Sequence, residues 1–186
     1  MKSSNGMYFG MFVPILAASL IFCSGCRSKE TTTADVNASM LKYAREKRYD
    51  RAISLGEQWA QKEPNDYIIR IQLASVYLSK ASVDVAHRKE LVRRAERYAN
   101  EAVKVEPTGL ATLQLAAAVL EGAGDLSDGV PAERCDDYRS ALQVTEKEKA
   151  LLQDDSVADQ HRTSIITARE STAARVRGKM QSSGCE

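Results

Sequence analysis

The chain has 186 residues, and its 26 lysines and arginines are almost balanced by 25 aspartates and glutamates, which leaves a formal net charge of +1. A protein that binds nucleic acid neutralises phosphates with a basic surface, and this balance supplies no such excess, so nucleic-acid binding is disfavoured. With about 160 residues behind the N-terminal segment, the chain can form one domain of modest size.

The N-terminal segment has the layout of a secretory signal. Lys2 is the only early charge, residues 7–22 are largely apolar, and the next charge is Arg27. Residues 23–26, with the sequence CSGC, resemble a bacterial lipobox, in which small residues precede a cysteine that is acylated and becomes the mature N-terminus. The resemblance implies that residues 1–25 are a signal peptide and that Cys26 carries a lipid.

Two other interpretations of this segment stay open. Residues 3–26 carry no charge, and about 20 apolar residues can cross a bilayer, so the segment could be an uncleaved anchor instead of a cleaved signal. Gly10 and Pro14 weigh against that anchor. A thiol site at Cys23 and Cys26 would need a folded polar environment, which an apolar export segment does not supply.

Cleavage before Cys26 would change the composition of the remaining chain. Lys2 is lost but no acid, so the 26 basic residues become 25, equal to the 25 acidic residues. All three phenylalanines are lost too, so the core has to consist mainly of Ala, Leu, Val and Ile. Such a core favours closely packed helices over a sheet. Residues 26–35 lack apolar periodicity and are expected to be the lipidated end and a tether.

From residue 36 onward the pattern is helical, with interruptions at Pro64, at Pro107 and in the glycine-rich stretch 122–131. Within this region Tyr43 recurs as Tyr77, 34 residues later. Repetition at this period is typical of helical repeat arrays.

The repeated residues resemble the tetratricopeptide repeat (TPR), a helix-turn-helix with an aromatic residue in its first helix, small residues where the helices cross, and a closing proline. The first repeat carries Tyr43, Tyr49, Ala52 and Pro64, and the second carries Leu73, Ala74, Tyr77, Ala95, Ala102 and Pro107. A third can be drawn from Leu110, with Tyr138 and Ala141 in its second helix. The resemblance implies an all-α fold with two to three TPR-like helical hairpins, a short α-solenoid, over residues 36–155.

The chain departs from the TPR pattern at two insertions. Residues 79–87 lengthen the second repeat and residues 122–134 lengthen the third, and the tryptophan and glycines of the family are missing from their usual places. A generic array of helical hairpins is therefore the alternative to a TPR array.

The C-terminal region is expected to close the array. Residues 156–178 combine a narrow apolar stripe with many polar residues, which is typical of a capping helix, and residues 179–186 are expected to form a flexible tail. Cys135 and Cys185 are the only cysteines behind Cys26. Outside the cytosol they could form a disulfide if the fold brings them together, a question that the sequence leaves open.

No pattern in the chain points to catalysis or to metal binding. His87 and His161 are the only histidines, and both are expected on the surface. The stretch 122–125 (GAGD) lacks the Lys-Ser/Thr pair of a phosphate-binding loop. Four acids near it lack the spacing of a calcium loop and are expected in a solvated acidic loop: Asp125, Asp128, Asp136 and Asp137. We therefore predict no enzyme, no cofactor and no metal.

In TPR arrays the first helices of successive repeats line a concave face that holds a peptide or a partner helix. Carried over by position, seven residues of this chain would form the partner groove, unless they are ordinary exposed helix positions: Asn37, Leu41, Arg45, Gln72, Ser75, Ser79 and Gln114. The resemblance thus implies a module that binds another envelope protein or peptide, either alone or as a homo-oligomer with a larger surface.

Together the two resemblances imply a lipid-anchored adaptor that serves a cell-envelope machine such as a secretion, pilus or polysaccharide export system. Arg27 follows Cys26 where inner-membrane lipoproteins often carry Asp, which favours the periplasmic face of the outer membrane. A structural lipoprotein that bridges membrane and cell wall is the alternative, and an envelope hydrolase is less favoured.

Overall fold

The computed structural model divides the chain after Glu30 into two units, and it describes residues 31–127, 131–153 and 159–185 of the second, Thr31–Glu186. The expected signal peptide and residues 26–30 of the expected lipidated end and tether, Cys26 among them, lie outside the described residues. The account that follows concerns the second unit.

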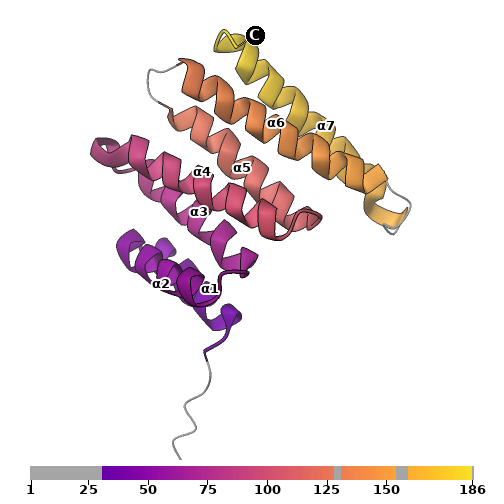
Figure 1. The fold of residues 1–186 in the computed structure, drawn as a ribbon. Coiled ribbons are helices and arrows are strands. Elements are labelled where there is room, and N and C mark those ends of the chain that lie inside the picture. Colours follow the sequence, from indigo (N-terminus) through magenta and orange to yellow (C-terminus); the bar gives the residue numbers. More distant parts are fainter. Residues whose placement is uncertain (1–30, 128–130, 154–158, 186) are drawn as a thin grey trace, which may run out of the picture. The chain divides into compact units, whose positions relative to one another are not determined.

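The described residues form helices joined by short connections, which confirms the expected all-α fold (Figure 1). No helix in this part of the chain is both long and apolar enough to span a membrane. The elements in order are α1 (Thr33–Arg45), α2 (Tyr49–Lys62), α3 (Tyr67–Ala81), a 3₁₀ turn η1 (Val85–His87), α4 (Arg88–Val105), α5 (Leu110–Leu126), α6 (Pro131–Gln153) and α7 (Asp159–Ser182).

The first helix begins at Thr33, three residues before the expected start of the domain, because its end is capped. The Thr32 hydroxyl accepts a hydrogen bond from the Asp35 backbone N–H at 3.3 Å, and the Asp35 carboxylate accepts one from the Thr32 N–H at 3.2 Å. A Thr followed three residues later by an acid is a local signal for a helix start. The expected tether is therefore already helical over residues 33–35.

The turn between α2 and α3 is fixed by Asp66. Its carboxylate accepts hydrogen bonds from the Trp59 indole N–H and the Thr33 hydroxyl, both at 2.7 Å, and from the Ile69 backbone N–H at 3.1 Å. One side chain thus joins α1, α2 and α3. This turn and the one after Val105 fall at Pro64 and Pro107, as the sequence predicts.

Each helix packs against the next along the chain, and α3 also packs against both α1 and α5. The helices α1, α3 and α5 therefore lie side by side (Figure 1). Small side chains permit this close approach, and the core is rich in fully or almost fully buried alanines: Ala52, Ala60, Ala74, Ala81, Ala95, Ala99, Ala102, Ala116 and Ala123.

The glycine-rich stretch does not end α5, which continues to Leu126. A Cβ atom at Gly124 would lie 2.5 Å from Cε1 of Tyr138, so glycine is needed here because the Tyr138 ring of α6 packs directly on the α5 backbone. The expected helix interruption at residues 122–131 was therefore wrong for residues 122–126. The glycines there allow neighbouring side chains to pack against α5.

The acids near this stretch do not form a solvated loop either. Asp125 lies in α5 and accepts a 2.8 Å hydrogen bond from the Tyr138 hydroxyl, and Asp136 and Asp137 lie in α6. Asp137 is buried. The expected acidic loop was wrong for these three residues, because α5 and α6 extend through them; Asp128 lies outside the described residues.

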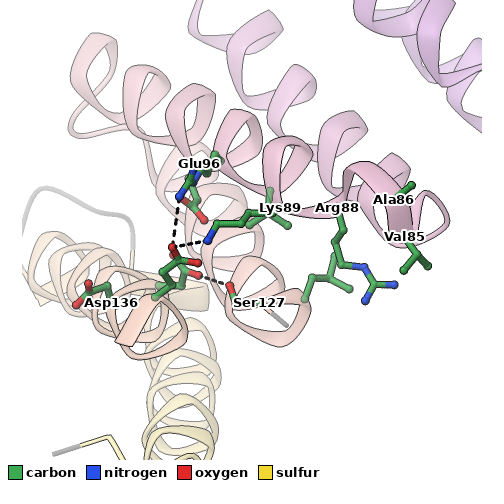
Figure 2. Close-up of a pocket in the computed structure, with 12 residues that line it drawn as sticks. Val85, Ala86, Arg88, Lys89, Glu96, Ser127 and Asp136 are labelled. Atoms are coloured by element: carbon green, nitrogen blue, oxygen red, sulfur yellow. Dashed lines mark hydrogen bonds and ion pairs between the residues drawn. The ribbon is translucent and has the colours of Figure 1, made fainter. Parts of the chain in front are cut away.

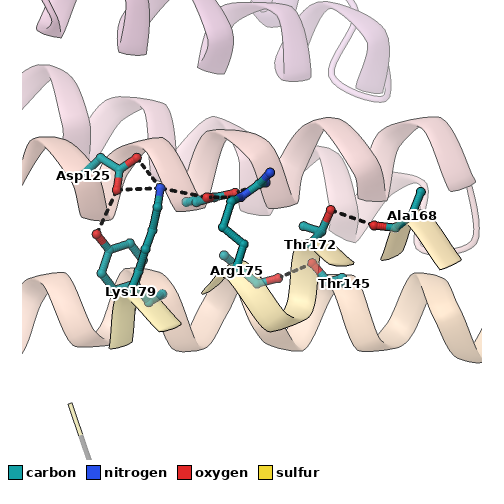
Figure 3. Close-up of polar contacts among 9 residues, drawn as sticks. Asp125, Thr145, Ala168, Thr172, Arg175 and Lys179 are labelled. Atoms are coloured by element: carbon teal, nitrogen blue, oxygen red, sulfur yellow. Dashed lines mark hydrogen bonds and ion pairs between the residues drawn. The ribbon is translucent and has the colours of Figure 1, made fainter. Parts of the chain in front are cut away.

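The last helix, α7, packs on α6 and reaches α5 through charged side chains. The buried carboxylate of Glu121 accepts two hydrogen bonds from Arg175, at 2.9 and 2.7 Å, and Lys179 lies 2.8 Å from it. Figure 3 shows Lys179 reaching Asp125 as well, at 2.6 Å. Burial raises the pKa of Glu121, but Arg175 and Lys179 outweigh it and hold that pKa below its usual range.

The end of the chain is fastened to the start of α6 by a disulfide between Cys135 and Cys185. The expected flexible tail, residues 179–186, was therefore wrong for its described part. Residues 179–182 are helical, because α7 continues to Ser182 with Lys179 in its ion pairs. Residues 183–185 form a hydrogen-bonded turn that presents Cys185 to Cys135.

Candidate binding groove

A groove with a volume of about 250 Å³ lies between α1 and α3. Its walls are mainly apolar, and the residues that line it are Leu41, Ala44, Arg45, Tyr49, Gln72, Ser75, Val76 and Ser79. Five of the seven residues predicted to form a partner groove are among them: Leu41, Arg45, Gln72, Ser75 and Ser79.

Helical periodicity explains why these residues meet. Leu41 and Arg45 are four residues apart, so they share one face of α1, and Gln72, Ser75 and Ser79 share one face of α3 at spacings of three and four. Because α1 and α3 pack side by side, the two faces flank one depression. The small Ala44 and Ser75 side chains leave room in it.

The groove offers a cation and several polar groups to a ligand. The exposed Arg45 guanidinium has no ion pair or hydrogen bond within the part of the chain that the structure describes, and the same holds for the Gln72 amide. The hydroxyls of Ser75 and Ser79 donate to carbonyls of their own helix, at 3.2 and 2.8 Å. Their oxygen lone pairs remain able to accept hydrogen bonds.

The two remaining predicted residues lie outside the groove lining. Asn37 is one turn before Leu41 on α1, and its buried Oδ1 accepts no hydrogen bond from the described residues. Gln114 is exposed on α5, next to Leu115, which is 45% exposed. On α3, Ile68 is 40% exposed and stands four residues before Gln72. Uncovered apolar side chains thus lie near these positions on α3 and α5.

No model of a known protein family matches this chain, and no curated protein sequence matches it.

Cys26, His87 and His161 are the other positions that the sequence analysis singled out. Cys26 lies outside the described residues, and so does the side chain of His161. The exposed His87 ring lies 3.0 Å from the Asp84 carboxylate in the connection between α3 and α4. Within residues 31–127, 131–153 and 159–185, no three His, Cys, Asp or Glu side chains are grouped as metal ligands would be.

A second pocket, of about 370 Å³, lies where η1, α4, the end of α5 and the start of α6 meet (Figure 2). Val85, Val92 and Leu126 form apolar parts of its wall, and the carboxyl groups of Glu96 and Asp137 lie within hydrogen-bond reach of each other in that wall. Burial, followed by the proximity of Asp137, raises the pKa of Glu96 to about 8. Burial also raises the pKa of Asp137.

Sequence reasoning missed this pair. Glu96 and Asp137 are on different helices, and neither belongs to a motif. Only the packing of α6 against α5 brings Asp137 to the edge of α4.

Proposed function

We propose that this protein is a membrane-tethered interaction module in which TPR-like helical hairpins hold a peptide segment of another envelope protein. The observation that carries the proposal is the groove between α1 and α3, lined by five of the seven residues that the repeat pattern assigns to a partner surface.

The composition of the groove indicates the chemistry of its partner. Leu41, Ala44 and Val76 suit an apolar side chain, and Arg45 at the rim suits a carboxylate. An unpaired guanidinium gains most from an anion with two oxygens, because it can donate two parallel hydrogen bonds. A short segment with an apolar residue next to an acidic residue therefore fits this groove.

Two features support a location in the bacterial envelope. The Cys135–Cys185 disulfide fits an exported protein, because thiols are kept reduced in the cytosol. The lipobox-like residues 23–26 supply the anchor, with Cys26 as the acylated residue and the periplasmic face of the outer membrane as the site. The protein would then serve an envelope machine by holding one of its components near the membrane.

Changes in the groove are expected to abolish partner capture. Arg45→Ala should weaken binding at least tenfold, or about 1.4 kcal/mol, because it removes the groove's unpaired cation. Ser79→Trp should have the same effect because it fills the groove. The measurement is affinity capture from envelope extracts, followed by titration of the recovered partner.

Matched controls exist on α2, where Arg51 and Ser54 are also exposed but lie outside the groove. Arg51→Ala and Ser54→Trp should recover the partner as well as the wild type does. Equal recovery by all four variants would contradict the groove. Retention on isolated cell wall without a protein partner would support a structural bridge, and substrate turnover would support a hydrolase.

The lipid anchor has a separate test. Cys26→Ala should abolish acylation and release the protein from membranes, because a thioether-linked lipid needs the cysteine sulfur. Metabolic labelling with a fatty acid and fractionation of membranes measure both effects. Continued membrane association of the unacylated variant would instead support an uncleaved signal anchor.

A further inference from the structure

The second pocket separates α4 from α6, and polar side chains bridge it. On one side Lys89 and Arg93 both reach the same oxygen of Glu133, at 2.9 and 3.3 Å (Figure 2). On the other side the Glu96 carboxyl donates a hydrogen bond to the Asp137 carboxylate. Asp137 also accepts a 2.9 Å hydrogen bond from the Ser127 hydroxyl, just beyond the end of α5.

Among the neighbouring cations, Arg93 lowers the pKa of Glu96, but it does not outweigh burial and Asp137. Lys89 and Arg93 are engaged by Glu133, and Arg139 pairs with Asp136. Within the described residues, neither Glu96 nor Asp137 forms an ion pair with a lysine or an arginine. Two sets of charged side chains border the pair: Arg88, Lys89 and Arg93 on α4, and Glu133, Asp136 and the nearby Arg134 at the start of α6. From the end of α5 and just beyond it, Leu126 and Ser127 face the pair.

We propose that Glu96 and Asp137 form a proton-dependent clamp that holds the first turns of α6 against α4 across this pocket. With one proton between them, the carboxyl groups make a hydrogen bond that joins the two helices. Without that proton, two carboxylates face each other in a partly buried site that already contains Glu133 and Asp136, and like charges in such a site repel.

The direction of the pH effect follows from the raised pKa of Glu96, about 8 against a usual value of 4.5. Between pH 4.5 and about pH 8, the folded protein keeps a proton on this pair that the unfolded chain has released. The clamp therefore stabilises the fold fully below pH 4.5, and its contribution is lost as the pH rises towards 8. Loss of one bound proton corresponds to a change of up to about tenfold in the unfolding equilibrium per pH unit.

Opening of the clamp would have a local structural consequence. The ion pairs of Glu133 remain, since Lys89 and Arg93 hold the pKa of Glu133 below its usual range. The start of α6 would then turn about these pairs and uncover the apolar wall at Val92 and Leu126. The pocket is thus expected to be narrower in acid and wider in mild alkali.

Chemical unfolding of the full chain between pH 5.5 and 7.5 tests the clamp. The unfolding equilibrium constant of the wild type should rise by up to about 100-fold over these two units. Glu96→Gln should remove this dependence, because its amide donates to Asp137 at every pH. Glu133→Gln is the matched control: it loses two ion pairs in the same pocket but should keep the pH dependence, because Glu133 is charged throughout this range.

A pH-independent wild type would overturn the clamp, and so would a Glu96→Gln variant with the wild-type pH dependence. Asp137→Asn provides a second test should Glu96→Gln fail to fold, and it too should lose the dependence. Hydrogen exchange adds a local readout: after correction for intrinsic rates, protection at residues 131–141 should fall with pH while protection in α2 stays constant. A uniform loss of protection along the chain would contradict a clamp between α4 and α6.

Discussion

Replacement of Cys185 by serine is expected to lower the free energy of unfolding by about 2 to 4 kcal/mol. The disulfide joins residues 50 positions apart and ties the end of α7 to the start of α6. Its loss frees the unfolded chain and leaves α7 held by a small apolar cluster and by ion pairs to α5 and α6, among them those of Arg175, Lys179 and Arg169. Denaturant unfolding, followed by circular dichroism, measures the effect.

Two comparisons show whether the disulfide itself is responsible. Cys135→Ser should match Cys185→Ser, and wild-type protein kept in reductant should match both variants. Reductant should leave the variants themselves unchanged. An identical stability of oxidised wild type and Cys185→Ser would contradict a stabilising role for this bond.

Replacement of Gly124 by alanine is expected to destabilise the protein by about 1 to 3 kcal/mol, the range for overpacking a core. The added methyl group would lie 2.5 and 2.7 Å from two atoms of the Tyr138 ring. The ring is rigid, and its hydroxyl is held by Asp125. Tyr138 therefore cannot move away without losing that hydrogen bond.

Gly178 provides the matched control, because it is also a glycine within a helix but has no atom within 4 Å of its added Cβ. Gly178→Ala should stabilise the protein by about 0.5 to 1 kcal/mol through helix propensity alone. Thermal and denaturant unfolding of both variants measure the contrast. A stabilising Gly124→Ala would show that α5 and α6 are not in close contact at this point.

Local signals in the sequence predicted much of this structure. Pro64 and Pro107 mark turns because proline cannot continue a helix, and the spacing of Leu41 with Arg45 places both on one face of α1. The helix start at Thr32 was missed although its signal was present, since Asp35 stands three residues later. Apolar periodicity does not reveal a capping box, because the residues of the box are polar.

Contacts between distant residues could not be predicted in the same way. Glycine is common where helices end, and only the contact of Gly124 with Tyr138 shows that this glycine lies within a helix. Asp137 belongs to a polar run, and only the packing of α6 shows that it is buried beside Glu96. Both features depend on contacts between residues of different helices, and the residue pattern within one helix does not predict such contacts.

The succession of neighbouring helix contacts has a consequence for how a local change spreads. Each helix of the second unit packs chiefly on the helices that precede or follow it, with α1, α3 and α5 as the additional layer. In such a chain of neighbours, stability is approximately a sum of local terms. A structural change in α7 can affect α3 only through the contacts of α6 and α5. The two ends of the unit are therefore insulated from each other, and substitutions near Cys185 can accumulate without altering what the surface at Leu41 recognises.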